Sequence, residues 1–125
     1  MKKVIVSKNA PAPIGPYSQA IMAKGTLYVS GQIAIDPTTG NLVNSDIAAE
    51  THMVMKNLKA ILTEADMNFS NVAKCSIFVK DLNNFAAINQ VYGEYFPENP
   101  PARETVEVSR LPKDVNVEIS CIAFE

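Results

Sequence analysis

The stretch VNVEISCIAF, Val115 to Phe124, has the alternation that sets the expected fold. Successive side chains of a β-strand point to opposite faces of the sheet. One face receives Val115, Val117, Ile119, Cys121 and Ala123, and the other receives Asn116, Glu118, Ser120, Ile122 and Phe124. The first set is entirely apolar, whereas the second is polar at its start and apolar at its end. We therefore predict a strand with one face on a core and one open face.

Five further segments have the β-branched or alternating character of strands and are bounded by turn formers. These predicted strands are Lys3–Ser7, Gln19–Ala23, Thr26–Ile35, Val72–Lys80 and Arg103–Val108. The dipeptide Lys24-Gly25 can turn tightly, which predicts a hairpin between the second and third of them.

Two segments have the period of a helix instead. Between Asp46 and Asp66 apolar residues recur every three or four positions, and Glu50 is expected to lie away from this stripe. Asp46 and its two preceding residues can cap the first turn. A second helix is predicted from about 81–83 to Phe96, with four large side chains on its inner side: Phe85, Ile88, Tyr92 and Tyr95.

The resulting order is β-β-β-α-β-α-β-β, which predicts an α+β domain over residues 1–125 with two helices packed on one face of a mixed sheet. Two helices can cover only one face of such a sheet. The partly apolar second face therefore predicts a partner, and a second copy of the chain is the commonest one. We expect a homo-oligomer whose sheets face one another, with clefts between subunits.

Composition narrows the class of protein. The 125 residues are 47% hydrophobic and carry a formal net charge of −2, with acidic and basic residues mixed along the chain. This balance argues against nucleic acid as the main partner, since phosphate binding needs a concentrated basic face. No apolar stretch is long enough for a membrane span or a signal peptide, and Cys75 and Cys121 lie in apolar runs as expected of buried thiols. A cytoplasmic, reduced protein is expected.

The arrangements of residues that form common cofactor, metal and nucleophile sites are nearly all absent from the sequence. His52 is the only histidine and falls mid-helix, where a partly exposed structural role is the simpler explanation. The five glycines are scattered and form no phosphate-binding loop. We predict a protein without a metal or cofactor.

Arg103 stands out because Pro100 and Pro101 stiffen the chain before it. A guanidinium offers paired donors that match a carboxylate, which is the property needed to bind a small organic acid. An ion pair with Glu104 or Glu107 of the same chain explains Arg103 equally well.

Glu118 is the second candidate, because it shares its face of the last strand with polar residues. In a cleft between subunits it could hold or activate a water molecule, although a solvated edge position is also compatible with the sequence. An arginine for a carboxylate, an acidic residue for a water and no cofactor together suggest hydrolysis of a substrate that is already reactive. Water attack on a C=N bond fits this description.

Four stretches in order along the chain resemble the RidA family, also called the YjgF/YER057c/UK114 family. They are NAPAPIGPYSQA (9–20), YVSGQIAIDPTTGNL (28–42), FVKDLNNFAAINQVYGEYF (78–96) and PPARETVEVSRLPKDVNVEI (100–119). The resemblance implies a chorismate mutase-like α+β fold and a homotrimer with ligand sites between subunits. It also implies hydrolysis of reactive enamines and imines, such as 2-iminobutanoate and 2-iminopropanoate, to 2-oxo acids and ammonia.

The resemblance assigns roles to particular positions. The arginine of the family's PAR motif matches Arg103, which would hold the substrate carboxylate, and a family glutamate matches Glu118, which would position water. Positions lining the family's cleft match Tyr17, Ser30, Gly31, Phe85 and Asn89.

The sequence departs from the family pattern at two positions. Thr105 stands at a substrate-binding position where the deaminases have cysteine, and Ser120 replaces a second glutamate. Threonine suits a position that contributes backbone contacts, but it removes any thiol-dependent activity. Three functions stay open: a 2-imino acid deaminase, a regulatory protein that binds a small acid without turnover, and an enzyme for a different imine or carbamate-like substrate.

Overall fold

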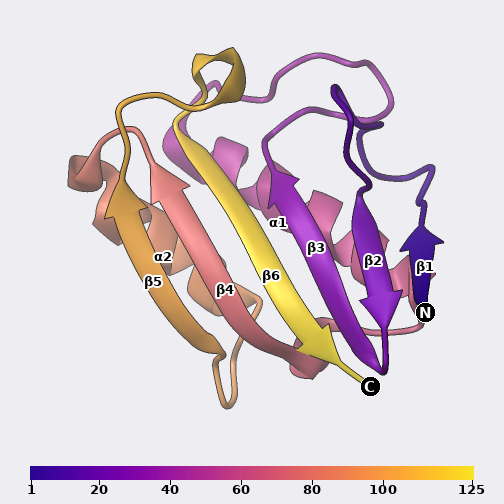
Figure 1. The fold of residues 1–125 in the computed structure, drawn as a ribbon. Helices are drawn as coiled ribbons and strands as arrows, with labels where there is room; N and C mark the ends of the chain where they lie inside the picture. Colours follow the sequence, from indigo (N-terminus) through magenta and orange to yellow (C-terminus); the bar gives the residue numbers. More distant parts are fainter.

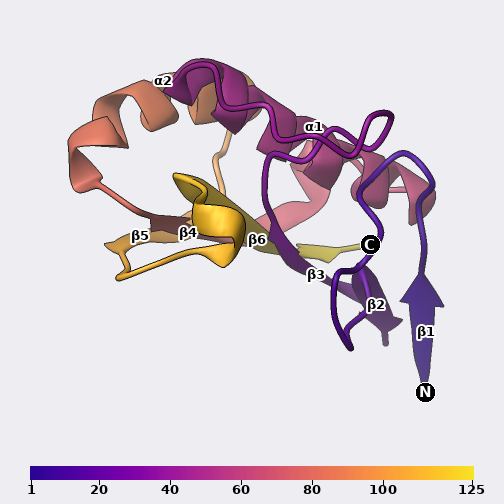
Figure 2. The same cartoon turned by 90° about the horizontal axis from the view of Figure 1, so that it is seen from above.

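A six-stranded mixed sheet with two helices on one face makes up the computed structural model, which describes residues 1–125 (Figures 1 and 2). The strands lie in the order β1-β2-β3-β6-β4-β5, and only the β4–β5 pair is parallel. The elements are β1 (Lys2–Ile5), β2 (Ala20–Ala23), β3 (Thr26–Gln32), α1 (Ile47–Glu64), β4 (Val72–Val79), α2 (Phe85–Glu94), β5 (Ala102–Glu107) and β6 (Val117–Phe124). The predicted α+β class is confirmed.

The element bounds differ from the sequence prediction by a few residues. Most strands are shorter than predicted, and three short 3-10 turns interrupt the predicted order at Phe69–Asn71, Leu82–Asn84 and Pro112–Asp114. The β2–β3 hairpin turns at Lys24 and Gly25, both with positive φ, as a tight turn of this handedness requires.

Helix α1 covers the central strands. The Asp46 side chain accepts a hydrogen bond from the backbone N–H of Ala49 at 2.7 Å, so the predicted cap is present. The buried side of α1 includes Val54, Met55, Leu58, Ile61 and Leu62. Neither α-helix has the length and apolar character that crossing a membrane requires.

The prediction for Glu50 was wrong, because this residue is fully buried. Its carboxylate accepts hydrogen bonds from the backbone N–H of Asn116 at 2.8 Å and from the Asn116 side-chain amide at 2.7 Å. Glu50 therefore ties α1 to the segment that enters β6. A buried carboxylate is tolerated here because both of its oxygens have donors.

The two faces of the sheet differ as the last strand predicted. Cys75 and Ile77 of β4 lie opposite Cys121 and Ile119 of β6, and all four are buried under the helices. Glu118 lies opposite Phe78 on the other face, which no helix covers (Figure 2). The predicted alternation of β6 is thus confirmed, and the two thiols are buried as expected.

Candidate functional site

Arg103 lies on the face of the sheet that carries the helices. Arg103 pairs in register with Cys75 of the neighbouring strand β4, and Thr105 pairs with Ile77. Because Cys75 and Ile77 are buried under the helices, the side chains of Arg103 and Thr105 also project toward α2. The Oγ1 atom of Thr105 is buried and has no hydrogen-bond partner. Arg103 and Thr105 therefore belong to one group of polar side chains at the edge of the core.

The ion pair considered from the sequence is not formed. Glu104 is paired instead with Lys74 at 3.0 Å and accepts a hydrogen bond from Ser76. The carboxylate of Glu107 accepts from the backbone N–H of Leu82 at 2.9 Å. Neither ion pair of the chain includes Arg103. Its guanidinium lies over two aromatic rings, with Cζ 5.6 Å from the Phe85 ring centroid and 5.0 Å from that of Tyr92.

A surface groove of about 400 Å³ borders Arg103. It lies between the end of α2 and the proline-rich segment before β5, and Asn89 is one of the residues that line it. The groove is lined by Asn89, Tyr92, Gly93, Phe96, Pro100, Pro101 and Arg103. Phe85 was predicted on the inner side of its helix, but it begins the helix and is 41% exposed.

Glu118 and Gly31 form the centre of a second group. A Cβ atom built on Gly31 would lie 2.7 Å from Oε2 of Glu118 and 2.8 Å from its Cδ, so only glycine leaves room for this carboxylate. Neither ion pair of the chain includes Glu118. Burial raises the pKa of the Glu118 carboxyl, because no nearby donor or cation offsets the loss of water around the charge.

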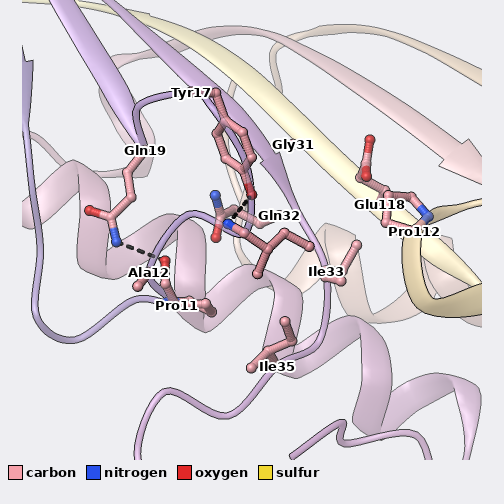
Figure 3. Close-up of a pocket in the computed structure, with 11 residues that line it drawn as sticks. Pro11, Ala12, Tyr17, Gln19, Gly31, Gln32, Ile33, Ile35, Pro112 and Glu118 are labelled. Carbon is pink, nitrogen blue, oxygen red and sulfur yellow. Dashed lines mark hydrogen bonds between the residues drawn. The ribbon is translucent and has the colours of Figure 1, made fainter. Parts of the chain in front are cut away.

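The carboxylate lines a narrow recess of about 40 Å³ together with Tyr17 (Figure 3). The Tyr17 hydroxyl accepts a hydrogen bond from the backbone N–H of Ile14 at 3.2 Å. A cavity needs a volume of roughly 10–15 Å³ for each water molecule that it holds. The recess therefore suits water better than a complete substrate. Ser30 lies beside Tyr17 in an adjoining groove and donates to the backbone carbonyl of Ser18.

Gln19 holds this loop and was not singled out from the sequence. Its side-chain amide donates to the carbonyls of Ser7, Ala10 and Pro11, and its Oε1 accepts from the backbone N–H of Ser7. A glutamine at the start of a predicted strand, three residues after Pro16, is the sequence signal that could have found it, because the backbone groups of a proline-rich loop need side-chain partners.

The two groups do not meet within one chain. Phe85, Asn89, Arg103 and Thr105 lie toward α2, whereas Tyr17, Ser30, Gly31 and Glu118 lie around the start of β6, with Glu118 on the open face of the sheet. No residue lines both the groove and the recess. A single substrate could contact both groups only if they came from two copies of the chain.

His52 lines neither the groove beside Arg103 nor the recess beside Glu118. Its Nδ1 lies 2.8 Å from the hydroxyl of Tyr95, so the ring links α1 to the end of α2. No cluster of three or more histidine, cysteine or acidic side chains is arranged to hold a metal ion.

Comparison with known proteins identifies the family. A sequence model described as Endoribonuclease L-PSP matches residues 7–125. The chain belongs to this family, the RidA family. Among RidA relatives, a RutC family protein from Pyrococcus horikoshii is 54% identical over 125 residues, which cover 100% of this chain and 99% of the relative.

Two further RidA relatives are informative. A human protein named 2-iminobutanoate/2-iminopropanoate deaminase is 41% identical over 125 residues, covering 100% of this chain and 91% of its own. The crystal structure of a Rid family protein of unknown function from Yersinia pestis is 49% identical and superimposes with a TM-score of 0.97 over 100% of both chains. The fold of this chain is therefore the RidA fold.

Proposed function

We propose that the protein hydrolyses reactive 2-imino acids, such as 2-iminobutanoate and 2-iminopropanoate, to 2-oxo acids and ammonia. The observation that carries this proposal is the guanidinium of Arg103, which lies at a groove without an acidic partner from its own chain. Such a guanidinium is available to bind a substrate carboxylate through two parallel hydrogen bonds. The name of the human relative supports the choice of reaction.

In this reaction water adds across the C=N bond, and the resulting carbinolamine loses ammonia to leave a C=O bond. Arg103 would fix the substrate through its carboxylate. Glu118 would hold the attacking water, accept a proton from it and return the proton to the departing nitrogen. Its raised pKa suits this cycle, because a more basic carboxylate takes up a proton more readily.

We propose that the active form is a homotrimer with its sites between subunits. The two groups of site residues lie in separate places on one chain, so a neighbouring copy has to supply the second group. The open face of the sheet offers a surface for association, with Tyr28, Val106 and Phe124 each at least 40% exposed. In a closed ring of identical subunits every interface is the same, so the ring contains one identical site for each subunit.

The proposal favours a small acid over the RNA that the family description names. The chain carries a net charge of −2 and one histidine, which is bonded to Tyr95. RNA binding depends largely on neutralising phosphates with clustered basic residues. A binding protein without turnover, and an enzyme for a different imine, share the same groove and are distinguished by experiment.

The first experiment couples a threonine dehydratase to this protein in the presence of semicarbazide, which traps free imine. We expect the wild type to suppress semicarbazone formation and Arg103→Ala to lose this effect. Lys59→Ala is the matched control, since it removes one positive charge at an exposed position of α1. If the wild type leaves semicarbazone formation unchanged but binds 2-oxobutanoate, the deaminase proposal is rejected in favour of a binding protein or another imine.

Subunit mixing tests the shared site. Arg103→Ala and Glu118→Gln chains are each expected to be inactive alone. When they are unfolded together and refolded at equal amounts, about one quarter of the interfaces combine an intact Arg103 with an intact Glu118. Recovery of about one quarter of the wild-type rate supports a site between subunits, and no recovery contradicts it.

A further inference from the structure

We infer that Tyr92 is a positioning residue for Arg103: its ring fixes the guanidinium so that the hydrogen-bond donors are free for a substrate carboxylate. This inference rests on the proposed role of Arg103 in carboxylate binding. It adds a residue to which neither the sequence pattern nor the family match assigned a role.

The first observation concerns what holds Arg103 in place. A partly buried arginine ordinarily has a carboxylate or carbonyl partner, but here both ion pairs of the chain belong to lysines. The guanidinium carbon lies over the rings of Phe85 and Tyr92 instead. A ring face attracts a cation without using its N–H donors, so the edge of the guanidinium stays available for a ligand.

The second observation is that the two rings are not equivalent. Phe85 is 41% exposed at the first position of α2, whereas Tyr92 is 5% exposed and is part of the main hydrophobic core. The Tyr92 ring also packs against Phe96, with the centroids 4.8 Å apart. Tyr92 is therefore the fixed surface on which the guanidinium rests, and it is also the nearer of the two rings.

Helix geometry places these residues in one row. Phe85, Asn89 and Tyr92 are separated by four and three positions, so they follow one face of α2. Asn89 and Tyr92 line the groove beside Arg103. The same helix face thus carries the polar amide and the aromatic support, and β5 carries the arginine that lies against them.

The hydroxyl of Tyr92 does not supply this support. It is buried without a hydrogen-bond partner, although the thiol of Cys75, which pairs in register with Arg103, is close enough to interact weakly with it. Burial raises the pKa of Tyr92, so the phenol stays neutral and adds no charge beside the guanidinium. The ring, rather than the hydroxyl, is expected to carry the effect.

The test measures binding of 2-oxobutanoate by calorimetry alongside KM and kcat in the semicarbazide assay. We expect Tyr92→Leu to raise both the Kd and the KM by about tenfold with a smaller change in kcat. The attraction between a part-buried cation and an aromatic ring contributes about this factor to an affinity. Tyr92→Phe keeps the ring and is expected to stay within about twofold of the wild type. If Tyr92→Phe is as impaired as Tyr92→Leu, the hydroxyl is the functional group and the inference is wrong.

A double-mutant cycle separates positioning from a loss of packing. Arg103→Lys weakens binding in the wild-type background, and this loss should shrink in the Tyr92→Leu background if the ring acts through the guanidinium. Additive losses overturn the inference. Tyr92→Met, which removes the ring but keeps more of the side-chain volume, provides a second variant if Tyr92→Leu does not fold, and a wild-type Kd in that variant also overturns the inference.

The readouts keep this inference distinct from the proposed reaction. If the wild type binds 2-oxobutanoate but does not consume imine, the deaminase function fails while the binding cycle still tests Tyr92. If Arg103→Ala binds 2-oxobutanoate as tightly as the wild type, the premise fails, and the inference about Tyr92 falls with it.

Discussion

A methyl group at position 31 should displace the Glu118 carboxylate while leaving the rest of the site intact. The added Cβ would lie 2.7, 2.8 and 3.0 Å from Oε2, Cδ and Cγ of Glu118. Carbon and oxygen atoms ordinarily approach to about 3.5 Å, so the overlap extends along most of the side chain. Gly31 does not have a positive φ, and alanine can therefore adopt its backbone conformation.

The expected cost to stability is small compared with the cost to activity. The half-buried Glu118 side chain can swing away, so we expect Gly31→Ala to destabilise the fold by about 1 kcal/mol, near the lower limit for overpacking. A protein of this size then loses about 4 °C in Tm. Loss of a positioned acid–base group lowers kcat/KM by about 100-fold or more.

The assay is semicarbazone trapping, combined with calorimetric binding of 2-oxobutanoate to show that the Arg103 group still works. The matched comparison adds Gly31→Ala to Glu118→Ala, where the methyl has nothing left to displace and should cause little further loss. Wild-type kcat/KM in Gly31→Ala, or a large additional loss in the double variant, would refute the assignment of a functional carboxylate at this place.

Four further predictions concern stability, pH and assembly. Glu50→Ala leaves two part-buried donors of Asn116 unpaired and should lower the free energy of unfolding by about 3 kcal/mol, measured by urea denaturation; a loss below about 1 kcal/mol contradicts the structural role. Burial raises the pKa of Glu118, so kcat/KM should fall with decreasing pH at a higher pH than for an ordinary glutamate, and a fall only at the pH of an ordinary glutamate contradicts the proposed base. The folded state binds the Glu118 proton more tightly than the unfolded chain does, so the ionised carboxylate lowers stability as pH rises through the window between the unfolded and folded pKa values. Glu118→Gln should therefore raise Tm at pH 7, and an unchanged or lower Tm contradicts this expectation. Ile122→Asp places a charge on the open face opposite Tyr28 and should reduce the mass measured by light scattering to that of one chain, whereas an unchanged mass places the contact elsewhere.

Local patterns were sufficient to predict the two helices, the hairpin at Lys24-Gly25 and the alternation of β6, because each depends on residues close in sequence. The face on which Arg103 lies was not predictable in this way. It depends on the parallel register that sets Arg103 beside Cys75, and that register arises from packing between distant segments. The separation of Arg103 from Glu118 on one chain is the direct result.

Burial of polar groups was the other feature that the sequence did not predict. Glu50 breaks the polar side of α1 because its partner, Asn116, is distant in sequence. Tyr92 was expected on the inner side of α2, and it is there, but its contact with a guanidinium requires β5 to lie beneath that helix. In both cases a side chain suited to one environment receives its partner only through the tertiary fold.

The facing pair of cysteines offers a way to follow opening of the central sheet. Cys75 and Cys121 are paired across β4 and β6 beneath both helices, and each is less than 5% exposed. The chain contains no tryptophan, so intrinsic fluorescence is a weak reporter of its folding. Burial also raises the pKa of both thiols, which suppresses their reaction with alkylating reagents in the native state. Mass spectrometry after timed alkylation would therefore count molecules in which the innermost strands have separated, and doubly labelled chains would distinguish complete opening from fraying at one strand.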